Sequence, residues 1–105
     1  MSDACSSAND IFVAYQKQLN AMLGACKTQV QHDQIVNQYV LARDAAYGCI
    51  DKALNQNDPV LQALQKQATA VVAALNAIDT QLNDIAKVID CATQAAAIVG
   101  KLVAL

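Results

Sequence analysis

Hydrophobic residues near the start of the chain recur at intervals of three and four, which places them on one face of an α-helix. They are Phe12, Tyr15, Leu19, Met22 and Cys26. Ser7 is suited to cap this helix, because Asp10 follows three residues later and favours a helix N-terminus. The pattern predicts a first helix over residues 7–30.

A polar stretch at residues 28–34 separates this pattern from a second one. We place a turn near His32, with Asp33 as the cap of the next helix. A second broad apolar face then predicts a helix over residues 33–55. Its apolar positions are Ile35, Val36, Tyr39, Val40, Ala46, Tyr47, Ile50, Ala53 and Leu54.

The clearest turn signal is the segment Asn55-Gln56-Asn57-Asp58-Pro59. Its amides favour a turn, and they lead into an aspartate cap with proline at the first helical position. Beyond it, an apolar heptad continues from Leu61 to Val103. The heptad is uninterrupted, and its only weak point is the segment 79–84, which contains capping residues but neither Gly nor Pro. This region can therefore form one long helix or two.

Two architectures fit these patterns. We favour an all-α, antiparallel up-down-up-down four-helix bundle, stapled by disulfides, with further turns near His32 and Asn83. Its helices are expected at residues 7–30, 33–55, 59–80 and 84–104, within a single domain of residues 1–105. The alternative is a long two-helix antiparallel coiled-coil hairpin that turns only near Asn57, with arms roughly 70 Å long.

The chain has four cysteines, Cys5, Cys26, Cys49 and Cys91, and this even number in a short domain permits two disulfides. In the bundle, levels along the helices predict the pairs Cys26–Cys91 and Cys5–Cys49. In the long hairpin, Cys5 and Cys49 lie too far apart for an intramolecular bond. The alternatives are four reduced cysteines, or a zinc site, which their wide spacing and the single histidine disfavour.

The composition narrows the classes of function. The chain has 21 alanines and only four aromatic residues, which suits slim helices packed closely together. Seven basic residues and a net charge of −2 give no basic patch for nucleic acid or for an anionic membrane surface. The last segment, residues 92–105, is apolar around most of its circumference. A transmembrane span needs about 20 apolar residues, and Lys87, Asp90 and Lys101 interrupt any such window. We therefore expect burial in the bundle or in a dimer interface, and no transmembrane span.

No pattern typical of a catalytic site is present. His32, the single histidine, is expected to be a solvated turn residue. The three glycines form no phosphate-binding loop, and the aspartates are spread over the solvent faces of the helices. We therefore expect neither an enzyme nor a cofactor or metal site.

A candidate contact surface lies on the second predicted helix. Arg43, the only arginine, is one turn from Tyr39 on one side and from Tyr47 on the other. A guanidinium between two phenols is favoured at protein interfaces. The alternative is that Arg43 only packs its stem on the tyrosines at the edge of the bundle, which is the more common role of such a side chain.

The leading hypothesis is a non-catalytic interaction protein that binds a protein partner, or itself as a homo-oligomer, through a helical face. One alternative is a carrier of a small apolar ligand or lipid between the helices, with Tyr39, Arg43 and Tyr47 holding a polar headgroup. Another is an inhibitor or immunity-type protein.

The segment Leu23-Gly24-Ala25-Cys26 resembles a bacterial lipobox, in which the cysteine is lipidated. A lipobox follows an apolar segment, whereas residues 16–20 are mostly polar, so we interpret Cys26 as the inward-facing end of the first helix. Residues 1–10 have no Lys or Arg and do not resemble a signal peptide. The cysteines nevertheless favour an extracytoplasmic location, either secreted or periplasmic.

Overall fold

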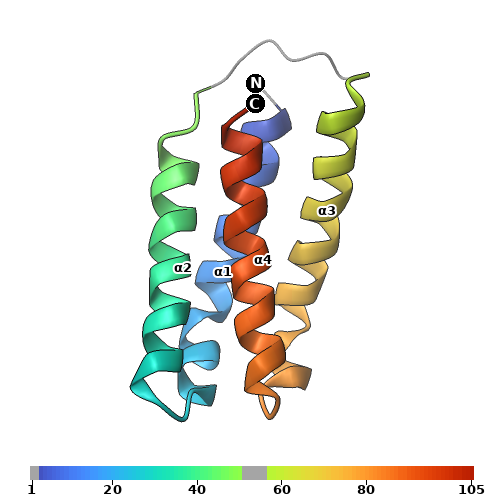
Figure 1. The fold of residues 1–105 in the computed structure, drawn as a ribbon. Helices are drawn as coiled ribbons and strands as arrows, with labels where there is room; N and C mark the ends of the chain where they lie inside the picture. Colours follow the sequence, from blue (N-terminus) through green and yellow to red (C-terminus); the bar gives the residue numbers. More distant parts are fainter. Residues whose placement is uncertain (1–2, 51–56) are drawn as a thin grey trace.

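The computed structural model describes residues 3–50 and 57–105, and it shows an all-α fold (Figure 1). Its helices are α1 (Asp3–Ala25), α2 (Gln29–Tyr47), α3 (Pro59–Asn76) and α4 (Ile85–Val103), with a short 3₁₀ helix η1 (Ile78–Gln81) between the last two. The predicted antiparallel four-helix bundle is confirmed. Overall extents of 43 × 23 × 18 Å exclude a hairpin with arms of about 70 Å.

The helices alternate in direction, but their order around the bundle is not their order along the chain. Helices α1 and α4 lie in the middle and pack on each other, while α2 and α3 flank them on opposite sides (Figure 1). Across the described residues, α2 and α3 do not touch. As a result, α1 lies beside α3 and α4 beside α2 in parallel pairs, and only the α1–α2, α3–α4 and α1–α4 pairs are antiparallel.

The first turn lies at residues 26–28, several residues before the predicted position near His32. Thr28 caps α2, because its hydroxyl accepts a hydrogen bond from the backbone N–H of Gln31 at 3.2 Å. The Gln31 side chain in turn accepts from the backbone N–H of Lys27 at 2.8 Å, which satisfies a second free donor in the turn. The predicted boundaries at residues 30 and 33 are therefore wrong.

The outer boundaries of the first two helices also differ from the prediction. Helix α1 begins at Asp3, not at Ser7, and its first turns bury Ala4 and Ala8. Helix α2 ends at Tyr47, and the N–H of the following Gly48 bonds to the carbonyl of Asp44 at 3.0 Å. Residues 51–56, which complete the predicted helix and begin the predicted Asn55–Pro59 turn, lie outside the described residues.

The predicted caps of the second half are confirmed. Asp58 accepts a hydrogen bond from the N–H of Val60 at 2.8 Å, and Pro59 is the first residue of α3. Helix α3 ends at Asn76, not at residue 80, because η1 occupies the start of the polar segment 79–84. Asp84 then caps α4 by accepting from the N–H of Lys87 at 3.4 Å.

The core lies between the two middle helices and their flanking partners. The heptad of α3 and η1 is buried throughout, at Leu61, Leu64, Ala68, Val71, Leu75 and Ile78. Helix α4 contacts all three other helices, which explains why its sequence is apolar around most of its circumference. Fully buried alanines such as Ala8, Ala92 and Ala95 leave room for close packing of the middle pair.

Candidate functional site

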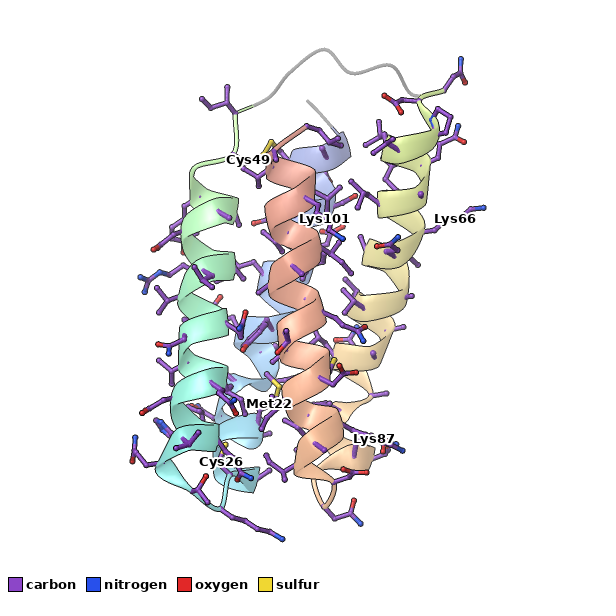
Figure 2. The ribbon with its side chains drawn as sticks, viewed as in Figure 1. Met22, Cys26, Cys49, Lys66, Lys87 and Lys101 are labelled. Carbon is purple, nitrogen blue, oxygen red and sulfur yellow. A yellow bond between two sulfur atoms is a disulfide. The ribbon has the colours of Figure 1, made fainter. Side chains whose placement is uncertain are left out.

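The Cys5–Cys49 disulfide joins the first turn of α1 to the residue that lies two positions beyond α2. The two Cα atoms are 5.8 Å apart, and the bond spans a sequence separation of 44 residues. This predicted pair is confirmed. It holds the α1–α2 hairpin closed at the end opposite its turn, where Figure 2 labels Cys49.

The predicted Cys26–Cys91 bond is absent, and both cysteines are free thiols. Because the first turn lies at residues 26–28, Cys26 is at the tip of the bundle, far from Cys49 (Figure 2). Cys91 is six residues into α4, so it lies about 9 Å along the bundle axis from the start of that helix. Cys26 lies at the end of the bundle where α4 starts, so this separation is beyond the reach of a disulfide. Its side chain lines a groove between α3 and α4.

Neither free thiol has the environment of a reactive cysteine. Cys91 is 8% exposed, and burial together with the nearby Asp90 raises the pKa of its thiol. Burial also raises the pKa of Cys26, whose Sγ donates a weak hydrogen bond to the Met22 carbonyl at 3.5 Å. A raised pKa lowers the fraction of thiolate, which is the nucleophilic form.

All four aromatic residues gather between α1 and α2. The ring of Phe12 lies 5.7 Å from that of Tyr39 and 5.4 Å from that of Tyr47, and Tyr15 lies 5.7 Å from Tyr39. The fully buried Tyr15 donates its hydroxyl to the Ile35 carbonyl at 2.6 Å. Burial raises the pKa of Tyr15 well above that of a free phenol. The cluster therefore fastens α1 to α2 and has no ionised group at its centre.

The side chains of Tyr39, Arg43 and Tyr47 do not converge on one point. Tyr39 is half-buried within the aromatic cluster, and Tyr47 is 72% exposed although its ring contacts Phe12. The Nε atom of Arg43 donates to Asp44 Oδ1 at 3.2 Å. The guanidinium is thus engaged with its neighbour in sequence and not stacked between the two phenols.

His32 lies in the first turn of α2 and not in a loop as predicted. Its Nδ1 atom is 3.8 Å from Asp33 Oδ1, too far for a hydrogen bond. Among the described residues, no three His, Cys, Asp or Glu side chains gather as a metal site would require. Within the same ranges, no helix combines the length and the apolar character needed to cross a membrane.

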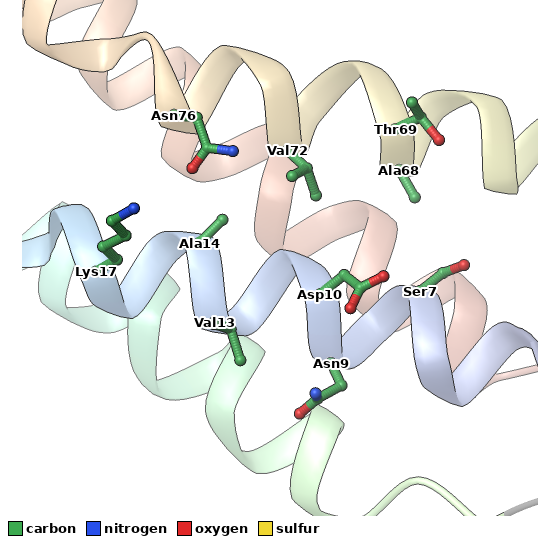
Figure 3. A pocket seen from close by; sticks show the side chains of 10 residues that line it. All are labelled: Ser7, Asn9, Asp10, Val13, Ala14, Lys17, Ala68, Thr69, Val72 and Asn76. Carbon is green, nitrogen blue, oxygen red and sulfur yellow. The ribbon is translucent and has the colours of Figure 1, made fainter.

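A polar groove of about 640 Å³ runs between α1 and α3 (Figure 3). Asp10 and Lys17 border it from α1, and Thr69, Val72 and Asn76 border it from α3. Asp10 and Lys17 are two turns apart, so they form no acid–base pair. The groove offers separate polar contacts along its edges but no convergent catalytic group.

Three further hollows of about 580, 360 and 310 Å³ follow one another along the groove between α3 and α4. Their outer rims are formed by exposed residues that alternate at intervals of three and four. We call these residues the α3–α4 face: Ala63, Gln67, Ala70, Ala74 and Ala77 on one side, and Lys87, Asp90, Gln94, Ala97, Lys101 and Ala104 on the other.

The sequence analysis missed this face, although its signal is in the sequence. Its positions form a second heptad, shifted by one residue from the buried heptad of Leu64, Ala68 and Val71. A heptad composed largely of alanine is easily taken for the edge of the core. Only the exposure of these residues separates the two stripes.

Comparison of the chain with protein-family models, with curated proteins and with solved structures finds no significant match.

Proposed function

We propose that this protein is a non-catalytic interaction protein that binds a protein partner, which can be a second copy of itself, through the α3–α4 face. One observation carries the proposal: this exposed face has the a/d spacing of a packing surface and is built mainly from alanine. An exposed helix face usually carries long polar side chains. A row of small residues instead permits the backbone of another helix to approach closely.

A carrier of an apolar ligand has less support. Carriers usually enclose most of the ligand in an apolar cavity. The α1–α3 groove and the hollows along α3 and α4 are instead rimmed by exposed residues and open to solvent. The Tyr39, Arg43 and Tyr47 side chains, which were to hold a headgroup, border none of these grooves.

Site-specific photo-crosslinking tests the proposal in the cells from which the protein comes. A benzophenone amino acid is placed at Gln67 on the α3–α4 face or, as a matched control, at Gln16, an exposed glutamine of α1. We expect a discrete protein adduct from Gln67 and none from Gln16. An equal pattern from both positions, or no protein adduct from Gln67, would refute the proposed function.

A further inference from the structure

We infer that the occupant of the α3–α4 face is a second copy of this chain, packed antiparallel to the first about a two-fold axis. The inference rests on the proposed function, because it names the partner of the same face. Three features of the face support it: the positions of Asp90 and Lys101 along α4, the small residues of α4, and the area of the face.

The α4 side of the face carries two bases, Lys87 and Lys101, and one acid, Asp90. Of these, Asp90 and Lys101 lie at symmetrical positions about the middle of the face. Asp90 and Lys101 are eleven residues apart, which is three helical turns, so they lie on one stripe about 16 Å apart. The midpoint between them falls between Gln94 and Ala97. Asp90 accepts a hydrogen bond from Gln94 at 3.0 Å, and among the described residues neither Asp90 nor Lys101 forms an ion pair.

A two-fold axis at this midpoint, perpendicular to the helices, brings opposite charges together. With α4 packed antiparallel on its copy, Asp90 of each chain faces Lys101 of the other, and Gln94 faces Ala97. In such an interface each contact occurs twice, so two ion pairs form at once. Lys87 then faces Ala104, and the small residues Ala97 and Ala104 permit the two α4 helices to approach closely.

The other face-to-face arrangement, with the two-fold axis along the helices, lacks this complementarity. It would place each α4 over α3 of the second copy at the same level. The α3 side of the face carries no charged residue, so Asp90 and Lys101 would each meet only alanine or glutamine. The absence of an ion pair disfavours this register.

The size of the face suits a reversible dimer. From Ala63 to Ala77 and from Lys87 to Ala104 it is roughly 25 Å long, and two helices spaced at 8–10 Å make it roughly 18 Å wide. That footprint is about 450 Å² per copy, or about 900 Å² in total, which is the size of a weak, transient interface. A net charge of only −2 opposes association weakly. We therefore expect weak, reversible self-association.

Charge reversal in the full-length chain tests both the partner and the register. Asp90→Lys or Lys101→Asp alone replaces two attractive contacts with two repulsive ones, so each should raise the dimer Kd about tenfold or more by sedimentation velocity. The double variant Asp90→Lys/Lys101→Asp restores both pairs with reversed sign and should return the Kd toward that of the wild type. Asp10→Lys and Lys17→Asp on α1 are matched controls and should leave the Kd unchanged.

Three outcomes would overturn the inference. The first is a monomer at every concentration up to the millimolar range, and the second is a dimer whose Kd the swap does not restore. The third is a Gln67 crosslink solely to a different protein, which would sustain the proposed function while removing the second copy as occupant. A Gln67 adduct of twice the chain mass, with rescue by the double reversal, supports it.

Discussion

Replacing both cysteines of the Cys5–Cys49 bond with serine measures how much the stability of the bundle depends on one covalent crosslink. Both positions are half-buried, so the new hydroxyls retain access to water. The bond spans 44 residues, and a closed loop of this length restricts the unfolded chain strongly. On the chain-entropy model its removal costs about 4 kcal/mol of unfolding free energy. Domains of this size have only about 5–15 kcal/mol in total.

Urea denaturation followed by circular dichroism provides the assay, at a single low protein concentration so that association does not contribute. The oxidised wild type, the reduced wild type and the Cys5→Ser/Cys49→Ser variant are compared. We expect the last two to unfold at similar, lower urea concentrations. Their m-values should be larger, because an unfolded chain without the crosslink exposes more surface. Cys26→Ser is the control, since it removes a thiol that forms no disulfide.

The reasoning would be refuted by a variant that unfolds at the same urea concentration as the oxidised wild type. It would also be refuted if reductant lowered the stability of the Cys5→Ser/Cys49→Ser variant, because another disulfide would then contribute. A lower midpoint without a larger m-value would show that the bond acts in the native state and not through the unfolded chain.

Four further predictions concern individual residues. Tyr15→Phe removes the hydrogen bond to the Ile35 carbonyl but keeps the ring, so we expect a loss of about 1 kcal/mol in urea denaturation; a loss of several would contradict this. Because burial raises the pKa of Tyr15, the folded state favours its neutral form. Stability from this group should be full below the pKa of a free phenol, near 10, and should fall as pH rises above it, measured as the urea midpoint against pH. Iodoacetamide should label Cys26 before the more buried Cys91, by peptide mass mapping, and equal rates would count against the placement of Cys91. Gly24→Ala should stabilise α1 by about 0.5–1 kcal/mol, since the added Cβ meets nothing within 4 Å; a lower midpoint would contradict this.

The helical fold and the second half of the chain follow from sequence patterns whose physics is local. The Asp58–Pro59 signal marks the start of α3 because capping and the fixed proline backbone need no tertiary context. The buried heptad from Leu61 follows from the periodicity of the helix itself. The Cys5–Cys49 pair follows from the reversal of the chain, which places the start of α1 near the end of α2.

The position of the first turn shows where such patterns fail. The polar segment at residues 28–34 predicted a turn, but most of it belongs to α2. The segment is polar because this end of the bundle is exposed to solvent, and even the apolar Val30 is 68% exposed there. The capping pattern from Thr28 to Gln31 carried the correct signal and was overlooked. This error moved Cys26 away from the tip, and the predicted bond to Cys91 followed from it. Which two helices lie in the middle of the bundle depends on which have the widest apolar faces. This cannot be predicted from one segment, because it requires comparison of all four helices.

The pairing of α1 with α4 at the centre has a consequence for synthesis of the chain. The ribosome makes α4 after the other three helices, and until then the apolar surfaces that α4 covers on these helices stay exposed. Because α2 and α3 do not touch, the first three helices alone form no closed core within the described part of the chain. We expect a nascent chain that ends before α4 to remain unfolded, as protease digestion of a fragment of residues 1–83 would show. We therefore expect the bundle to fold only once α4 has been made.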